Sequence, residues 1–512
     1  MNASAKSELL GELQREIEAL LQKLHHPVLV ENEVELIDLA AAQWRLTIEF
    51  GKLIFSAWNS AKSISRRVEE VAYRDRDRFG IFVGLPGRRE TATLEFRELL
   101  APPTGGRARR RTGFRQQLSA WLEREYRGWK FERVSNRSDR EHSFSAWYTR
   151  GLATQGQSAW AFLGLSEEEG TAALDGALAF GLIWLDWLRG QSDRMAITQL
   201  KLFLPPAAVG VNAHRAAFLD PRALNVEIFE WRTGQQAATP VDLRDYGNVE
   251  TRLAPRRQTE MLKASHAGLI QEMLGDLGAD LEVVPDSAGT FSSLRIAGLE
   301  VARIEGQLAP RIYFGLEGRV RRLDETRHDE FRDFVREVRR IRCAESPDPQ
   351  HEFYRLQSER WLETLLSQDI SRLDPALSPE DVYSQVPAFS GTDRGVMDLL
   401  TVTRGGRLAV VELKVQEEIN LPLQGLDYWL RVNWLQQRHQ FQEFGYFQGC
   451  ELLAAPPLLY LVSPAFRFHS TTEKLIRYFD RRIEVLLIGI NDTWRKEVKV
   501  LFRHPLPAAS PI

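Results

Sequence analysis

Hydrophobic and polar positions along the chain follow two different periods, which separate expected helices from expected strands. Residues 5–25 have apolar side chains at spacings of three and four, which predicts an amphipathic helix with one apolar face: Leu10, Leu13, Ile17, Leu20 and Leu24. The same spacing is typical of a coiled-coil seam. Two interpretations of this helix therefore stay open, a homodimer seam and packing on the body of the protein.

Residues 44–98 follow a period of two instead. Polar residues alternate with apolar ones in three runs, which contain Leu46 and Ile48, Phe79 and Ile81, and Leu94 and Phe96. Strands that bury one face have this pattern, so we expect an antiparallel β-meander. The next segment, APPTGGRARRRTG at 101–113, is expected to be a loop, because proline and glycine interrupt regular structure.

The stretch 113–205 is predicted to run helix, three strands, helix, strand. Its long helix, residues 167–188, is very apolar, but Asp175 and Asp186 interrupt it, which favours a buried helix over a membrane span. A similar order of elements recurs after residue 350. The stretch is therefore either a second copy of the C-terminal fold or an unrelated α/β domain.

The clearest domain boundary is the linker SPDPQ at 346–350, which has two prolines among five polar residues. We expect a multidomain α/β (α+β) protein. Its parts would be an N-terminal helix at 1–30, a β-rich domain at 31–105, an α/β domain at 106–275, β segments with a connecting helix at 276–345, an independently folding domain at 346–495, and a tail at 496–512.

Composition and charge limit the classes of function. The chain has 512 residues, of which 43% are hydrophobic and 27% charged, as in soluble proteins of several domains. A net charge of -3 argues against a basic coat over the whole protein but is compatible with a local basic groove. The arginines of the 101–115 segment either contact phosphates or lie on a solvated loop, and the candidates for contact are Arg109 and Arg110.

Cysteine usage and the N-terminal residues indicate the compartment. Cys343 and Cys450 lie far apart, which excludes a disulfide framework and a cysteine-based zinc site. The ten histidines show no metal-ligand spacing. The first residues carry acids and lack the apolar core of a signal peptide. We expect a reduced, cytoplasmic protein that does not enter a membrane.

The strongest chemical signal is a predicted hairpin, in which the turn RGG joins GVMDLLTVT to RLAVVELKV. With a turn of three residues, Thr403 faces Arg407, and counting back along both arms places Asp398 opposite Glu412. The Cβ atoms of such cross-strand neighbours are about 4.5–5.5 Å apart. Lys414 follows Glu412 by two residues, so the two side chains share a face.

Two carboxylates and an ammonium that converge on one spot suit phosphodiester hydrolysis. Mg²⁺ prefers one or two carboxylates plus water and phosphate oxygens, and Mn²⁺ is a substitute. A lysine beside the ion can orient or deprotonate the attacking water and offset developing charge. An aspartate inside the apolar run VMDLL is costly to bury without a partner, which also favours a functional role.

These residues resemble the D…ExK core of the PD-(D/E)XK nuclease superfamily over about residues 350–490. The set WLE, MDLL, VVELK and QGLDY is most similar to the RecB-, NucS- and Mrr-like branches, although Met397 stands where the superfamily has its proline. The resemblance implies a restriction-endonuclease-like αβββαβ domain in which Asp398 and Glu412 bind the metal and Lys414 is catalytic. It also implies a metal-binding acid on the preceding helix, which is Glu363, with Glu359 as the alternative.

The segment QGLDY matches the QxxxY motif of RecB-type members. The resemblance implies a catalytic role for Gln424, and substrate binding by Tyr428 and by Arg431, which is spaced for the same helix face. The alternative for Tyr428 is a core residue. The strand SAWAFLGL in the earlier stretch has no acid or lysine, so that stretch would be a degenerate nuclease-like copy.

We therefore expect a Mg²⁺-dependent deoxyribonuclease, with endo- and exonucleolytic cleavage both open, whose N-terminal domains position the DNA. The alternative is a nucleic-acid-binding or assembly protein that keeps the fold without turnover. RNA is the alternative substrate, because such a site contacts phosphates and carries no base code.

Overall fold

The structure is a computed structural model. It describes residues 3–506 apart from positions 22, 25–26, 32–33, 40–42, 50–51, 59–62, 76–77, 85–90, 99–105, 140, 192–195, 234–236, 245–250, 254, 279–280, 286–290, 307–309, 317–319 and 391–392. The described residues form eleven α-helices and four β-sheets, so the mixed α/β multidomain class expected from the sequence is confirmed. They divide into two compact units, of which the first is Met1–Thr104, Pro255–Leu365 and Arg495–Glu497, and the second is Gly105–Ala254, Leu366–Trp494 and Val498–Ile512.

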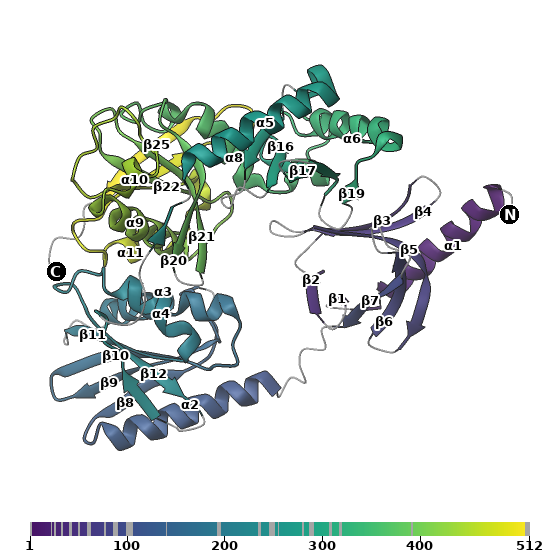
Figure 1. Ribbon diagram of the computed structural model, residues 1–512. Helices are drawn as coiled ribbons and strands as arrows, with labels where there is room; N and C mark the ends of the chain where they lie inside the picture. Colours follow the sequence, from purple (N-terminus) through teal and green to yellow (C-terminus); the bar gives the residue numbers. More distant parts are fainter. Residues whose placement is uncertain are drawn as a thin grey trace. The chain divides into compact units, whose positions relative to one another are not determined.

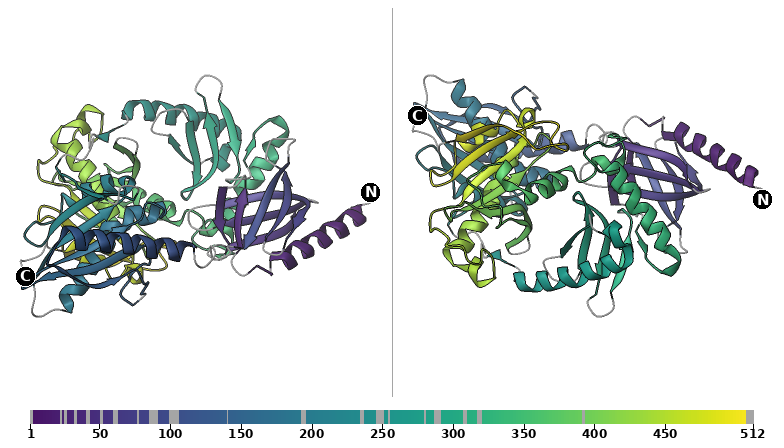
Figure 2. Two further views of the ribbon diagram at one scale, coloured as in Figure 1. Left: turned by 90° about the horizontal axis from the view of Figure 1, so that it is seen from below. Right: turned by 90° about the horizontal axis from the view of Figure 1, so that it is seen from above.

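The first unit begins with an antiparallel sheet and one helix (Figures 1 and 2). The helix is α1 (Ala3–Leu21), and the strands are β1 (Pro27–Glu31), β2 (Val34–Asp38), β3 (Gln43–Glu49), β4 (Lys52–Trp58), β5 (Ser63–Arg74), β6 (Arg78–Gly84) and β7 (Thr91–Glu98), in the order β2-β1-β7-β6-β5-β4-β3. The meander is thus confirmed, except that Ile48 on the edge strand β3 is exposed. The apolar face of α1 packs on the core of this sheet, which agrees with the interpretation that this helix packs on the body of the protein.

The remainder of the first unit is a second antiparallel sheet with four helices and two 3₁₀ turns. These elements are α5 (Arg256–Leu274), η1 (Gly275–Gly278), β15 (Glu282–Pro285), β16 (Phe291–Ile296), β17 (Leu299–Glu305), β18 (Arg311–Phe314), β19 (Arg321–Arg322), η2 (Glu325–Arg327), α6 (His328–Ile341), α7 (Glu352–Arg355) and α8 (Ser358–Gln368), which extends three residues into the second unit. The charged helix α6 buries one stripe, which contains Phe331, Val335, Val338 and Ile341, against this sheet.

The second unit contains two sheets with a helix pair on each. Its first half, within 105–254, has α2 (Gly106–Glu125), β8 (Lys130–Ser135), β9 (Tyr148–Gln155), β10 (Ser158–Leu165), α3 (Thr171–Gly190), β11 (Ile197–Leu204), α4 (Pro206–Ala216), β12 (Asn225–Arg232), β13 (Ala237–Pro240) and β14 (Thr251–Arg252). Successive residues of β10 face opposite sides. Trp160 and Phe162 pack under α2, whereas Ala161 and Leu163 pack under α3 and α4 on the other face (Figure 1).

The second half, within 366–512, repeats this arrangement. It has η3 (Ile370–Arg372), β20 (Tyr383–Ser390), β21 (Asp393–Val402), β22 (Leu408–Leu413), α9 (Leu421–Gln437), α10 (Gln440–Glu443), β23 (Leu458–Pro464), η4 (Ala465–Arg467), α11 (Thr472–Ile476), β24 (Glu484–Ile490) and β25 (Val500–Leu506). In the sheet order β14-β20-β21-β22-β23-β24-β25, only β22, β23 and β24 are parallel to one another.

One hydrophobic core joins the two halves of the second unit. It contains buried residues of α3 and α4 together with those of α9 and α11. Beyond α4 and α11 the backbones pair reciprocally, since Asp220 N–H donates to Tyr478 O and Asp480 N–H donates to Phe218 O, both at 2.8 Å. Leu219 and Phe479 form the antiparallel bridge between these bonds. The halves therefore meet through equivalent segments of each.

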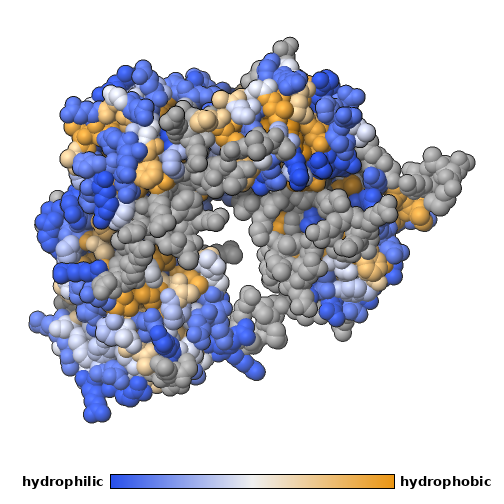
Figure 3. Space-filling view, viewed as in Figure 1, coloured by the Kyte–Doolittle hydropathy of each residue, from blue (hydrophilic) through white to orange (hydrophobic). Residues whose placement is uncertain are grey.

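Several boundaries differ from the expectations. Helix α2 begins at Gly106, so Arg109 and Arg110 lie on a helix rather than in a loop. The linker 346–350 lies inside the first unit, and 500–506, expected in a tail, form strand β25. Among the described helices, α3 is long and apolar enough to cross a membrane by length and composition, and most of it is buried in the protein. Hydrophilic residues cover much of the described surface on the face shown in Figure 3, with smaller hydrophobic patches.

The shared core leads to a prediction about fragments. A fragment of residues 366–512 would expose the buried faces of α9 and α11, and we expect it to show no cooperative thermal transition by circular dichroism. Co-expression with residues 105–254 should restore that transition, because the apolar surface is covered again. A cooperative melt of 366–512 alone would show that the shared core is dispensable.

Candidate metal centre

The predicted hairpin is present with the expected register. Its turn is held by Thr403, whose N–H donates to Arg407 O at 2.8 Å and whose Oγ1 accepts from Arg407 N at 3.0 Å. Gly406 has a φ of +85°, and a Cβ there would lie 2.1 Å from Glu451 O, so only glycine fits. The turn therefore sets the pairing of both arms.

Asp398 and Glu412 lie level with each other at the end of this ladder. The paired residues run from Val402 and Leu408 to Leu399 and Val411, and the two acids come next on either strand. Asp398 Oδ2 accepts a hydrogen bond from Leu413 N–H at 2.9 Å, so its carboxylate reaches across to the neighbouring strand. The side chain of Glu412 is almost completely buried, with a relative exposure of 3%.

Lys414 shares the face of Glu412. Its Nζ lies 3.4 Å from Glu412 Oε1, and its backbone N–H donates to Val462 O at 3.0 Å, which continues the parallel pairing of β22 with β23. Asp398 is half-buried, and the lysine side chain is more exposed than that of Glu412. The acid–acid–lysine arrangement expected from the hairpin is therefore present.

The helix α9 brings the QxxxY residues to the same face of the sheet. Burial first, and then the charges of Glu412 and Asp398, raise the pKa of Tyr428, so both acids act on this hydroxyl electrostatically. The guanidinium of Arg431 lies over the Tyr428 ring, 5.8 Å from its centroid. Gln424 Oε1 is buried and has no hydrogen-bond partner among the described residues. The ring of Tyr428 also packs on the core, as the alternative interpretation expected, and its role in substrate binding stays a prediction.

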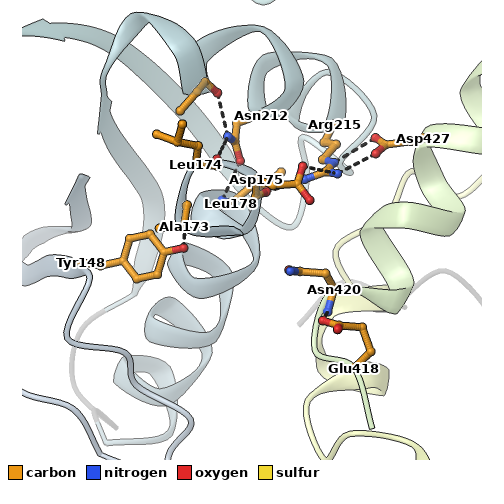
Figure 4. A network of polar contacts seen from close by, with 11 residues as sticks. Tyr148, Ala173, Leu174, Asp175, Leu178, Asn212, Arg215, Glu418, Asn420 and Asp427 are labelled. Atoms are coloured by element: carbon orange, nitrogen blue, oxygen red, sulfur yellow. Dashed lines mark hydrogen bonds and ion pairs between the residues drawn. The ribbon is translucent and has the colours of Figure 1, made fainter. Parts of the chain in front are cut away.

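A buried ionic network ties α9 to the first half, next to these residues (Figure 4). Arg215 of α4 is 1% exposed and binds Asp427 through two hydrogen bonds, Nε–Oδ1 at 2.9 Å and Nη2–Oδ2 at 2.6 Å. It also contacts Asp175 of α3, with Nη2–Oδ1 at 2.9 Å. Burial by itself would lower the pKa of Arg215, but the two carboxylates outweigh it and raise the pKa.

Sequence reasoning did not single out Arg215 or Asp427. A signal was present, because Asp427 is the one charge in the otherwise uncharged helix segment LPLQGLDYWL. Its helix neighbour Tyr428 is influenced by the carboxylates of the candidate site, whereas Asp427 faces the other half of the unit. The network therefore positions the helix that carries the candidate residues.

Two other predicted residues lie elsewhere in the second unit, and a third belongs to the first unit. Arg109 and Arg110 are on α2, on the face of the first sheet opposite to α3 and α4, so they are not brought together with the acids. Arg110 pairs with Glu168 at 2.8 Å. Glu363 is buried in the first unit beside Arg295, whose pKa is lowered by burial and by Arg360 and raised by Glu363. Its role as a third metal ligand stays a prediction.

A groove of about 460 Å³ lies between the halves of the second unit. One of the residues that line it, Glu417, follows Lys414 by three residues. Its lining includes Asp139, Phe180, Glu417, Glu418 and His469. Burial lowers the pKa of His469, against the effect of the two glutamates, so this imidazole is neutral at pH 7. The groove is therefore acidic, which disfavours a phosphate without a cation.

Among the described residues, one group of three side chains could hold a metal ion, and it consists of Asp139, Glu141 and His142. Their potential ligand atoms lie within 4.8 Å of one another. These residues lie on the connection between β8 and β9 and are exposed or half-buried. Asp139 Oδ2 lies 2.8 Å from His142 Nδ1, so the group is held by its own hydrogen bond. It shares no residue with the predicted centre.

Comparison of the chain with models of known protein families found no match, and a search of curated proteins also found none.

The buried network can be tested by removing its cation. Arg215→Ala would leave Asp175 and Asp427 facing each other without the cation between them. We expect the free energy of unfolding to fall by about 3 kcal/mol. This value is at the lower end for a broken buried pair, because both acids keep some contact with water. Urea denaturation measures this loss. The control is Arg124→Ala, which removes an exposed pair with Glu125 and should cost little. Equal effects of the two substitutions would contradict the role of the network.

Proposed function

We propose that the protein is a divalent-metal-dependent nuclease that hydrolyses phosphodiester bonds of DNA at Asp398, Glu412 and Lys414. The observation that carries the proposal is the juxtaposition of two carboxylates and an ammonium on one sheet face, with both acids acting electrostatically on Tyr428. The strand order of the second half, with its antiparallel β20-β21-β22 followed by parallel β23 and β24, supports the expected αβββαβ domain.

The donor set fits Mg²⁺ or Mn²⁺. Both acids offer hard carboxylate oxygens, which these ions prefer, from adjacent strands at one level. Two carboxylates side by side repel each other, and a cation between them removes that repulsion. Asp398 and Glu412 would hold the ion, which when bound polarises the phosphate and makes a coordinated water more acidic.

The remaining groups have roles that follow from their positions. Leu413 N–H fixes the orientation of the Asp398 carboxylate. Lys414 is more exposed than Glu412, and it orients the attacking water and offsets charge on the phosphate. Gln424 offers a buried carbonyl oxygen to that water, and Arg431 contacts a neighbouring phosphate from the same helix face. The first unit is assigned to substrate positioning.

The decisive test combines substitutions with a panel of nucleic acids. Single-stranded, double-stranded and branched DNA, and RNA, are incubated with the full chain in Mg²⁺, Mn²⁺ or EDTA. We expect cleavage of DNA that EDTA abolishes. Asp398→Asn, Glu412→Gln and Lys414→Met should each lower the rate by at least about a hundredfold, as is typical when one group that stabilises transition-state charge is removed.

The matched control is Glu484→Gln, an exposed acid on β24 of the same sheet, which should leave the rate unchanged. Cleavage that survives all three substitutions at the rate of the unmodified protein would refute the assignment. Binding of DNA without cleavage under any condition would favour a non-catalytic protein that keeps the fold.

A second prediction concerns the metal directly. An ion that binds only the folded state stabilises it by mass action, by about 1.4 kcal/mol at ten times its Kd. We expect Mn²⁺ to raise the Tm of the unmodified protein relative to EDTA, and to raise that of Asp398→Asn much less. Equal increases in both proteins would mean that the ion binds elsewhere, for example at Asp139, Glu141 and His142.

A further inference from the structure

The two halves of the second unit have one topology. In the first half, β8-β9-β10 are antiparallel, β10-β11-β12 are parallel, and β13 returns antiparallel. In the second half, β20-β21-β22, β22-β23-β24 and β25 have the same directions in the same order. Helices α3 and α9 occupy the same place, each between the third and fourth of these strands. The halves are therefore two copies of one fold.

Close packing fixes which residues correspond. Gly181 of α3 lies against Leu202 and Leu200 of β11, where a Cβ would come within 2.9 and 3.1 Å of their side chains. Gly425 of α9 lies in the same way against Leu461 and Leu459 of β23, at 2.6 and 3.2 Å. The two glycines are therefore equivalent, and so are the strand positions that they touch.

The strand pairing then identifies the counterpart of each candidate catalytic residue. In the first half, Leu202 pairs with Leu163, and Leu163 pairs with Arg150. In the second half, Leu461 pairs with Glu412, and Glu412 lies level with Asp398. On the strands, Arg150 is therefore the counterpart of Asp398, Leu163 that of Glu412, and Leu165 that of Lys414. On the helices, Phe180 is the counterpart of Gln424, and Trp184 that of Tyr428. Not one of the five functional side chains is kept in the first half.

The contacts of Arg150 support this correspondence and exclude a cation. Its guanidinium lies over the rings of Phe144 and Trp184, at 4.4 and 5.6 Å, much as Asp398 acts on Tyr428. Arg150 is 6% exposed, and although burial lowers its pKa to about 10, against the effect of Asp139, it stays protonated at pH 7. A fixed positive charge packed among aromatic rings therefore stands where the other half places a metal ligand.

We propose that the second unit is a paired nuclease fold with a single catalytic centre, and that each binding event breaks one strand of DNA. This inference rests on the proposed function. A nuclease that cuts both strands of a duplex in one event without repositioning the DNA uses one centre for each strand, and in this unit the second position is filled by Arg150, Leu163 and Leu165. Duplex DNA is therefore nicked.

The reaction at the one centre consumes one water for each break. The water oxygen forms a bond to phosphorus, and the bond from phosphorus to one bridging ester oxygen breaks. That oxygen leaves with a proton as a hydroxyl, and the phosphate stays on the other fragment with the added oxygen. A second break, in either strand, requires a new binding event.

The test is plasmid cleavage with the full chain in excess over supercoiled DNA and with Mn²⁺. We expect open circles to account for nearly all of the converted DNA before linear DNA forms, because the second cut is independent of the first. Linear DNA that appears together with open circles from the earliest time points would overturn the inference. Cleavage confined to single-stranded DNA in the substrate panel would also overturn it, because duplex DNA would then not be nicked.

Two variants separate this inference from the proposed function. Asp398→Asn should leave the plasmid supercoiled, and nicking that persists in this variant would sink the proposed function instead. Arg150→Met, which keeps the volume but removes the charge, should nick at the normal rate per folded protein, with folding checked by circular dichroism. A folded Arg150→Met protein that no longer nicks would show that the first half takes part in the chemistry, and would overturn the single-centre assignment.

Discussion

The buried contact of Arg215 with Asp427 and Asp175 is the interaction on which the second unit depends. A guanidinium that is 1% exposed is unfavourable unless carboxylates surround it, and these come from α9 on one side and α3 on the other. Helix α9 is thus held against the first half through Asp427. Because Tyr428 is the next residue, the same contact sets how the candidate centre is covered.

The centre itself depends on a much more local constraint, the three-residue turn that ends at Gly406. The positive φ of Gly406 and its close approach to Glu451 O allow only one pairing of the arms. That pairing puts Asp398 level with Glu412 and leaves Leu413 N–H to bind Asp398. The proposed chemistry therefore depends on the local register of the hairpin and on helix α9, which a distant ion pair holds in position.

The two similar folds place apolar residues in the first half at the positions where the second half has its candidate polar residues. In the first half, Leu163, Leu165 and Trp184 belong to the core that both halves share. The buried charge at the position equivalent to Asp398 is Arg150, which lies over aromatic rings. The first half thus packs against the helices of the second half, which carries the candidate centre.

The sequence by itself determined what depends on near neighbours along the chain: the hairpin register, the shared face of Asp398, Glu412 and Lys414, and the similar order of elements in two stretches. Periodicity and turn length are local, so they predict local geometry. Tertiary structure alone decided that these stretches share one core, that Arg215 meets Asp427, and that Arg109 lies on a helix away from the acids. Such contacts join residues far apart in the chain, and no local pattern of apolar and polar residues specifies which surfaces will meet.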